Sequence, residues 1–405
     1  MSDSSDGSTY EPFDPEFSRR ILDDAFYPIV DHYFRPRLLG AHALPEGGPL
    51  ILAANHSGSA FPYDGMVLDS LLWRRDGMRT EAKFRSVYEK MLSQRWWMRP
   101  FGIDNFWRRA GGVDLTFDNF DRLLARGERV IYYPEGVAGI GKGFRRRYRL
   151  QPFSTSFVIL AARHGAPVFP VHVINAEWVI PFNFTLPPLD WIMEEVFGVP
   201  FLPLPGAAFA ITFPWAWYLA TPARMIFVVG QPLDMRSLLR DEGVTDLANT
   251  ERDRARIKRV AERVRRKVQG ELDVHVKRHG RRPYQARSLV RALGRARGNA
   301  VLGRVLPTNW AVNFNRANRN ERRQPARGRL HAVLRDWDLL GFYLPLGWPL
   351  LSLARALRKP PYGYRGLSRA ERRRIEGRFV WRLKERPLPP ASEAATPAQH
   401  GAGRR

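Results

Sequence analysis

The chain contains no cysteine among its 405 residues. Disulfide bonds, cysteine metal sites and a thiol nucleophile are therefore excluded. The acidic N-terminus also lacks a basic segment followed by an apolar run, so no secretory signal peptide is predicted and a cytosolic face is expected. With 44% hydrophobic and 12% aromatic residues, the chain can form a sizeable core, which argues against general disorder.

Acidic residues are scarce in the last part of the chain. Residues 251–405 hold 12 Asp and Glu against 39 Lys and Arg, whereas residues 1–250 hold 28 against 26. Such an asymmetry indicates a polyanionic partner, either an anionic membrane or nucleic acid. Because the basic part carries no zinc-finger, RNP or helix-turn-helix signature, nucleic acid is not the expected partner, and an anionic membrane surface is favoured.

Short apolar runs alternate with segments of helical periodicity. Buried strands are predicted at 49–54, 129–133, 167–174 and 224–229. Helices are predicted at 14–34, 64–73, 118–126 and 157–163. The alternation indicates an α/β fold with a mostly parallel core sheet flanked by helices.

The composition divides the chain into four parts. Residues 1–13 are expected to be a disordered tail, 14–245 the main domain with an amphipathic N-terminal helix, 246–386 a basic and mainly helical extension, and 387–405 a second disordered tail. The extension is expected to associate with a membrane and to be dispensable for folding, so that a chain ending near Gly280 stays folded. Its long helix, 251–279, has an apolar stripe that suits packing on the core equally well.

Residues 196–223 carry no charge, and residues 339–354 form a second apolar stretch. About 20 apolar residues are enough to cross a bilayer as a helix. However, Pro200, Pro203, Pro205 and Pro214 interrupt the first stretch, and prolines break helices from within. An interfacial or buried segment is therefore favoured over a membrane span, and the second stretch is interpreted in the same way.

The first motif that carries chemistry is Asn55-His56 at the end of a predicted strand, with Asp64 shortly after it. Histidine titrates near neutrality and can accept a proton from a hydroxyl group at working pH. A carboxylate on the other ring nitrogen would orient the imidazole and stabilise its protonated form. The alternative is a histidine that only forms or caps the turn.

The second motif is Pro134-Glu135-Gly136 with Gly139, again directly after a predicted strand. Glycines let backbone N–H groups approach an anionic ligand closely. A basic cluster follows, which comprises Lys142, Arg145, Arg146, Arg147 and Arg149. A phosphate site fits this combination, and a solvated charged loop is the alternative.

Together the two motifs, followed by the apolar strand that starts at Pro167, resemble the glycerolipid acyltransferase family, the PlsC-like lysophosphatidic acid acyltransferases, over residues 30–240. The resemblance implies transfer of an acyl group from acyl-CoA or acyl carrier protein to a glycerolipid hydroxyl in phospholipid biosynthesis. It implies His56 as general base and Asp64 as its orienting group, with no metal, no other cofactor and no covalent intermediate. It implies a substrate-binding set that comprises Asn55, Glu135, Gly136, Gly139, Arg108, Arg145, Arg146 and Arg147. The protein is then expected to be peripheral or monotopic at a membrane.

Two departures from the family pattern bear on this interpretation. Seven residues separate His56 from Asp64, where the family commonly has four. The family's Gly-plus-Arg block, which helps to bind the acceptor phosphate, matches either Gly102 with Arg108 or the segment 111–116, which lacks the arginine. A non-phosphorylated acceptor, such as diacylglycerol or a long-chain alcohol, therefore stays open, as does a non-catalytic lipid-binding relative.

Overall fold

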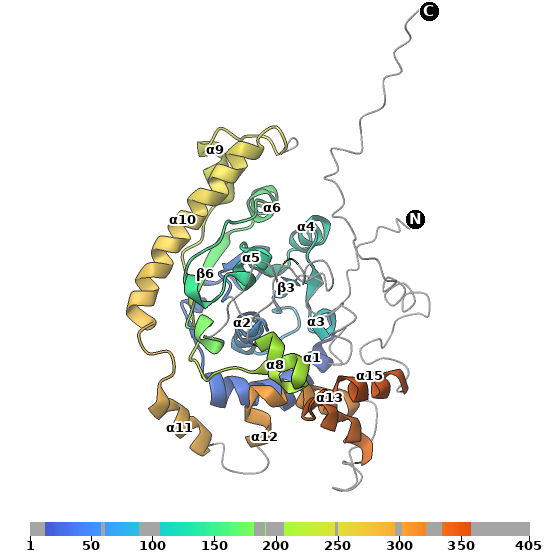
Figure 1. Cartoon of the computed structure of the whole chain (residues 1–405). Coiled ribbons are helices and arrows are strands. Elements are labelled where there is room, and N and C mark those ends of the chain that lie inside the picture. Colours follow the sequence, from blue (N-terminus) through green and yellow to red (C-terminus); the bar gives the residue numbers. More distant parts are fainter. Residues whose placement is uncertain are drawn as a thin grey trace, which may run out of the picture.

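A computed structural model shows the fold and describes residues 13–57, 61–88, 106–181, 191, 206–247, 250–295, 302–320 and 334–357 (Figure 1). Its centre is a seven-stranded sheet with the order β1-β7-β6-β2-β5-β3-β4. The strands are β1 Arg37–Leu39, β2 Leu50–Ala54, β3 Arg85–Tyr88, β4 Val113–Asp114, β5 Arg129–Tyr132, β6 Val168–Ile174 and β7 Ile226–Val229. All neighbouring strands are parallel except β6 and β7, which confirms the predicted α/β fold with a mostly parallel sheet.

Alternate residues of the central strand β2 face two separate cores. Leu50 and Leu52 point into one core, whereas Ile51 and Ala53 point into the other. Every residue of β2 is buried, as expected for a parallel strand covered on both faces. The molecule therefore has three layers, with helices on each side of the sheet.

The first helical layer consists of the N-terminal segment and the helix after β2. Its elements are α1 Pro15–Ile21, the π-helical η1 Leu22–Phe26 and η2 Ile29–Phe34, and α2 Tyr63–Arg75. The other layer contains α4 Phe117–Ala125, α6 Ser156–His164, α9 Met235–Asp241 and α10 Arg254–His279. Short elements complete this part: η3 Ala41–Ala43, α3 Phe106–Arg109, α5 Gly136–Gly141, η6 Phe144–Arg146, η7 Glu177–Val179 and α11 Ala286–Arg295.

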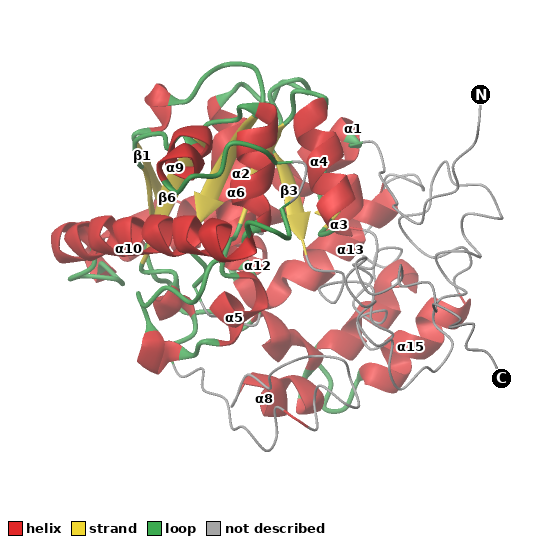
Figure 2. Ribbon diagram, turned by 90° about the horizontal axis from the view of Figure 1, so that it is seen from above, coloured by secondary structure: helices red, strands yellow, loops and turns green. Residues whose placement is uncertain are grey.

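The long helix α10 lies across the strands on the outer face of the sheet (Figure 2). Its buried stripe includes Ile257, Val264 and Leu272, and these side chains join the core that α4, α6 and α9 also line. Of the two roles open to this helix, its apolar stripe therefore serves packing on the core.

The C-terminal helices pack against the N-terminal ones, so segments distant in sequence share one core (Figure 1). They comprise α12 Leu302–Val305, η9 Pro307–Asn309, α13 Trp310–Asn320, η10 Trp337–Phe342 and α15 Trp348–Leu357. The Trp310 ring lies 5.4 Å from that of Phe26, and the Phe314 ring lies 6.3 Å from that of Phe17. A chain ending near Gly280 would lack this part of the core, and the expectation that it stays folded remains a prediction.

The uncharged stretch 196–223 is described only from residue 206 onwards. There it forms a helix, α8 Gly206–Thr212, and a 3₁₀ turn, η8 Pro214–Tyr218, with residue 213 between them. In the part of the chain that the structure describes, no helix is both long and apolar enough to span a membrane.

Candidate active site

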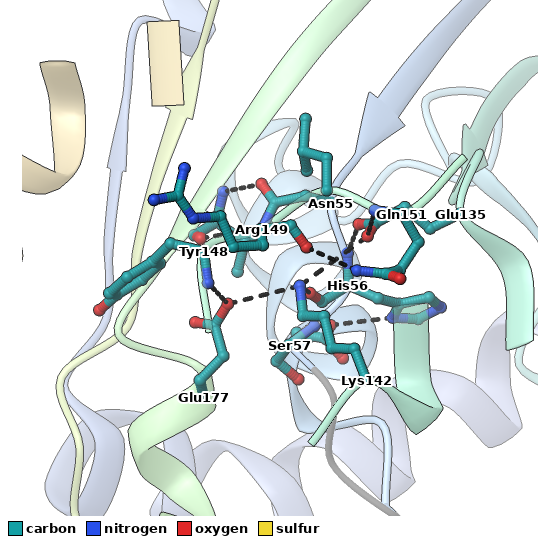
Figure 3. Close-up of polar contacts among 12 residues, drawn as sticks. Asn55, His56, Ser57, Glu135, Lys142, Tyr148, Arg149, Gln151 and Glu177 are labelled. Carbon is teal, nitrogen blue, oxygen red and sulfur yellow. Dashed lines mark hydrogen bonds and ion pairs between the residues drawn. The ribbon is translucent and has the colours of Figure 1, made fainter. Parts of the chain in front are cut away.

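The parallel pairing of β2 with β5 brings the two sequence motifs together. Ala53 is in register with Tyr132, and parallel strands end at the same edge of a sheet. His56 follows β2 by two residues and Glu135 follows β5 by three, so both lie at this edge (Figure 3).

His56 and Asp64 form a buried pair despite their long spacing. The ring Nδ1 lies 3.0 Å from Oδ2 of Asp64, which stands in the first turn of α2. Asp64 also accepts hydrogen bonds from the backbone N–H groups of Ser57 at 3.0 Å and Gly65 at 2.9 Å. Burial alone would raise the pKa of Asp64, but the His56 ring and these two N–H groups outweigh it and hold the pKa below its usual value. An ionised Asp64 thus holds Nδ1 and leaves Nε2 for a substrate proton.

Tyr133 supports the other side of the imidazole. The two rings are stacked, with centroids 3.9 Å apart and planes inclined by 13°. His56 is 8% exposed, so the ring has little room to move while an edge stays accessible. Tyr133 stands at the start of the second motif, directly before Pro134, but nothing in the sequence indicates that its ring supports His56.

Asn55 and Glu135 hydrogen-bond to the backbone, and neither side chain lines the pocket described below. The Asn55 side chain bonds both the N–H and the carbonyl of Val173, which ties the end of β2 to β6. Glu135 accepts from the N–H of His56 at 2.9 Å and from the N–H of Gln151 at 2.7 Å, and its side chain is fully buried. Both residues belong to the predicted substrate-binding set, and their hydrogen bonds fix the backbone around His56.

The two glycines of the second motif are required for different reasons. Gly136 has a φ of 54°, a left-handed conformation that favours glycine. At Gly139 an added Cβ would lie 2.7 Å from Cβ of Glu135 and 2.9 Å from Cβ of His56. Gly139 therefore allows α5 to pack directly against the catalytic turn, while Gly136 lines the pocket described next.

An apolar pocket extends from His56 into the first helical layer. Its lining includes His56, Tyr133 and Gly136, together with Met66 and Trp310. The elements that form it are mainly α1, η1, α2, β3, α3 and α5, together with the first residue of α13. A buried ion pair between Lys83 and Asp69 interrupts its otherwise mostly apolar wall. The pocket has the shape and chemistry to hold an aliphatic chain with its reacting end at His56.

The arginines predicted to bind a phosphate lie outside the pocket or in α3. Arg145, Arg146 and Arg147 are exposed on the loop after α5 and do not line the pocket. The guanidinium of Arg147 lies 4.8 Å from the centre of the Phe144 ring. Arg108 belongs to α3, and Gly102 lies outside the described residues.

The alternative Gly-plus-Arg match, 111–116, contributes to the wall of the pocket. Gly112 and Leu115 line it, and neither can bind a phosphate through a charged side chain. Phe106 and Trp107, which directly precede Arg108, also line the pocket, so both matches of the family block reach it and only 111–116 lacks the arginine.

Lys142 is a buried residue that sequence reasoning grouped with the exposed arginines. Its Nζ donates to the carbonyl of His56 at 2.6 Å and lies 3.6 Å from Oε1 of Glu177 (Figure 3). The only signal in the sequence is that Lys142 stands between two glycines and three residues ahead of the arginine cluster. Its partner Glu177 gave no signal.

Asp64→Asn is expected to lower kcat about tenfold or more, because the amide neither carries the charge that stabilises a protonated ring nor enforces the same tautomer. The measurement is steady-state acyl transfer by the purified variant. Asp31→Asn is the matched control, since Asp31 is 45% exposed and pairs with Arg74 away from the pocket. Equal activity of the two variants would mean that another group orients His56.

Residues 35–174 match the family model described as acyltransferase. Uncharacterized proteins of Mycobacterium tuberculosis and Mycobacterium bovis are each 30% identical to the chain over 215 residues, which is 51% of this chain and 57% of theirs. The chain thus spans little more than half the length of these relatives. Among solved structures, the 1-acyl-sn-glycerophosphate (LPA) acyltransferase PlsC from Thermotoga maritima is similar, with a TM-score of 0.35 and 15% identity over 66% of this chain and 79% of that chain.

Proposed function

Because the chain belongs, through residues 35–174, to the acyltransferase family, we propose that it moves a fatty acyl group from acyl-CoA or acyl carrier protein to a glycerolipid hydroxyl, with lysophosphatidic acid or a similar lipid as acceptor. The match confirms the acyltransferase family predicted from the two motifs. The observation that carries the proposal is the His56–Asp64 pair, 3.0 Å apart, with His56 in the wall of an apolar pocket.

The proposed reaction is direct transfer. Nε2 of His56 takes the proton of the acceptor hydroxyl, and the oxygen attacks the thioester carbonyl. The carbon–sulfur bond then breaks, and the leaving thiolate takes the proton from the imidazolium. Asp64 stabilises that imidazolium, and the apolar pocket holds the acyl chain. The products are the acylated lipid and the free thiol.

A panel of acceptors tests this proposal. Purified protein is incubated with labelled acyl-CoA, or with acyl carrier protein carrying the same chain, and with lysophosphatidic acid, glycerol 3-phosphate, diacylglycerol or a long-chain alcohol. The labelled lipid product is then identified. We expect an acylated glycerolipid, and a folded protein that labels none of these acceptors from either donor would refute the proposal.

A neutral acceptor is the second candidate. It is favoured by one observation, namely that the Gly112 segment on the pocket wall carries no arginine. Diacylglycerol or a long-chain alcohol would then be acylated by the same chemistry at His56.

Arg145→Gln combined with Arg146→Gln is expected to raise KM for a phosphorylated acceptor about tenfold, because charge-assisted hydrogen bonds to phosphate are lost. The KM for a neutral acceptor should stay the same. Arg263→Gln with Arg266→Gln is the matched control, since both side chains are exposed on α10. Equal losses with both acceptors would assign the cluster to the donor, the membrane or stability.

The proposed site of action is the surface of an anionic membrane, at which the enzyme is peripheral or monotopic. Its acceptor lives in a bilayer, and large exposed apolar side chains gather on α8 and the segment from η10 to α15. These elements are joined, since Nε1 of Trp348 donates to the carbonyl of Ala210 at 3.0 Å. We call this the apolar surface; its exposed residues are Phe209, Ile211, Trp337, Leu340, Tyr343, Leu344, Leu346, Leu353 and Leu357.

The charge of the surrounding sequence favours an anionic bilayer over a neutral partner. Residues 281–390 contain 26 Lys and Arg against 6 Asp and Glu. Each basic group near an anionic leaflet contributes about 1 kcal/mol. An exposed apolar surface beside such charge is typical of an interfacial membrane protein.

Leu346→Asn with Leu353→Asn is expected to weaken binding to anionic vesicles about tenfold or more. The reason is that two exposed leucines, which the bilayer would bury on binding, are lost. Val274→Ser with Val290→Ser is the control, as both are exposed outside the apolar surface. Binding should also weaken as salt rises. A protein that ignores anionic vesicles, or binds neutral ones equally at every salt concentration, would contradict the membrane proposal.

A further inference from the structure

Two charged side chains hydrogen-bond to the backbone of His56, and we call these two bonds the backbone grip. Its N–H donates to Glu135 at 2.9 Å, and its carbonyl accepts from Lys142 at 2.6 Å (Figure 3). Asp64 holds the ring itself. These three side chains come from different elements. Glu135 lies in the turn after β5, Lys142 is the C-cap of α5, and Asp64 lies in the first turn of α2.

We propose that Lys142, with Glu135 and Glu177 as its buried carboxyl partners, is a positioning residue that fixes the backbone of His56 and thereby the place of its ring. The proposal rests on the proposed function, in which His56 is the general base. It adds residues that act through His56 and never touch a substrate.

Burial separates this cluster from substrate binding. The side chains of Lys142 and Glu135 are 0% exposed, and that of Glu177 is 1% exposed. None of the three lines the pocket. The cluster therefore differs from the exposed arginines that follow it in sequence.

A buried ammonium group is costly unless its donors are satisfied and its charge is balanced. Lys142 has three donors: one bonds the His56 carbonyl, and the nitrogen lies 3.9 Å from Glu135 and 3.6 Å from Glu177. An apolar side chain would fill the same space without this cost. What only the charged group provides is a hydrogen bond to the His56 carbonyl.

The two glutamates anchor the cluster to the rest of the fold. Glu177, at the start of η7, also accepts from the N–H of Tyr148 at 3.0 Å, and Glu135 accepts from the N–H of Gln151. The cluster therefore links the ends of β2 and β5, the segment after β6 and the loop 142–151. Close packing of Gly139 on Glu135 and His56 leaves no room for the turn to shift.

Small displacements of a general base have large effects on rate. The base must lie within hydrogen-bond reach of the hydroxyl, and a misplacement of about 1 Å can cost roughly a hundredfold. Asp64 bonds the ring and the N–H of Ser57, and Tyr133 stacks on the ring, whereas Glu135 and Lys142 bond the N–H and the carbonyl of His56 itself. This backbone grip therefore fixes the point from which the ring extends.

Lys142→Met combined with Glu177→Gln is the main test, because it removes the ammonium group without leaving two facing carboxylates. We expect kcat to fall at least about tenfold, with KM for donor and acceptor changed less than about twofold. We also expect the downfield proton resonance of the His56 Nδ1–H, which reports its bond to Asp64, to shift or broaden. A role in stability alone would move neither the split between kcat and KM nor this resonance.

Glu177→Gln alone is the conservative second variant, in case the double variant does not fold. Burial raises the pKa of the Glu177 carboxyl to about 7, against the lowering by Lys142 and the Tyr148 N–H. Between pH 4.5 and 7 the folded protein then keeps a proton that the unfolded chain has lost, so wild-type stability falls as pH rises through this window. Glu177→Gln should flatten that dependence and lower kcat less than the double variant does.

The outcomes separate this inference from the proposed function. If no acceptor is acylated by the wild-type protein, the function fails, while the resonance and the pH dependence of stability still test the grip. Normal kcat in a folded double variant, or an unchanged Nδ1–H resonance, would overturn the positioning role.

Discussion

His56→Ala is expected to lower kcat by roughly 10²- to 10⁴-fold, the range that a general base supplies. In the proposed mechanism the Nε2 of this imidazole takes the hydroxyl proton, and among the described residues no other histidine lines the pocket. The fold should persist, because the ring contributes stacking on Tyr133 and one bond to Asp64, whereas the grip on the backbone remains. The measurement is acyl-transfer kinetics beside a far-ultraviolet circular dichroism spectrum.

His42→Ala is the matched control for this variant, since His42 lies in the short turn η3 and does not line the pocket. It should keep wild-type turnover. A folded His56→Ala protein that also keeps wild-type turnover would end the mechanism, whatever the acceptor proves to be.

Trp310→Ala is expected to lower the free energy of unfolding by about 3–5 kcal/mol, as for other large aromatic side chains removed from a core. Trp310 is 1% exposed, and its ring lies 5.4 Å from Phe26, 5.6 Å from Phe106 and 5.7 Å from Phe314. It joins the C-terminal helices to the N-terminal layer and also lines the pocket. Denaturant unfolding followed by intrinsic fluorescence measures the loss.

Trp337→Ala is the control within the same group of helices, since Trp337 is 42% exposed. Its cost should stay within about 1 kcal/mol. If Trp310→Ala also lowers the free energy of unfolding by no more than about 1 kcal/mol, the C-terminal helices do not share a core with the N-terminal layer.

The sequence predicts β2, β5, β6 and β7, in which every residue except the half-buried Val228 is buried. The runs at 49–54 and 167–174 correspond to β2 and β6, in which every residue is buried. The strands β1 and β4 have three and two residues, which is too short to show a periodicity. They form because they pair with the edges of the neighbouring strands β7 and β3. The residues of the two short segments alone do not indicate this pairing.

The motifs predict which residues gather at the site, but not the direction of each side chain. Asn55 and Glu135 are expected at the substrate and instead bond the backbone of Val173, His56 and Gln151. The pairing of β2 with β5 and β6 determines the contacts to Val173 and His56. Each of these contacts joins residues more than 75 positions apart in the sequence.

The role of Lys142 could not be predicted because its environment is assembled from distant segments. In the sequence it opens a run of basic residues, which is typical of a solvated loop. Glu177 stands 35 positions later, after β6, and only the folded sheet brings it within 3.6 Å of Lys142. The docking of α13 on α1 and η1 was hidden for the same reason.

The fate of the acyl label in the presence and absence of an acceptor tests direct transfer most directly. Wild-type protein is incubated with acyl-CoA labelled in the chain, with and without lysophosphatidic acid, and the label is followed in lipid, free fatty acid and protein. Direct transfer with His56 as base predicts label in the acylated lipid, release of the thiol only when the acceptor is present, and no label on the protein. Label bound covalently to the protein, or fatty acid released at the same rate without acceptor, would contradict it.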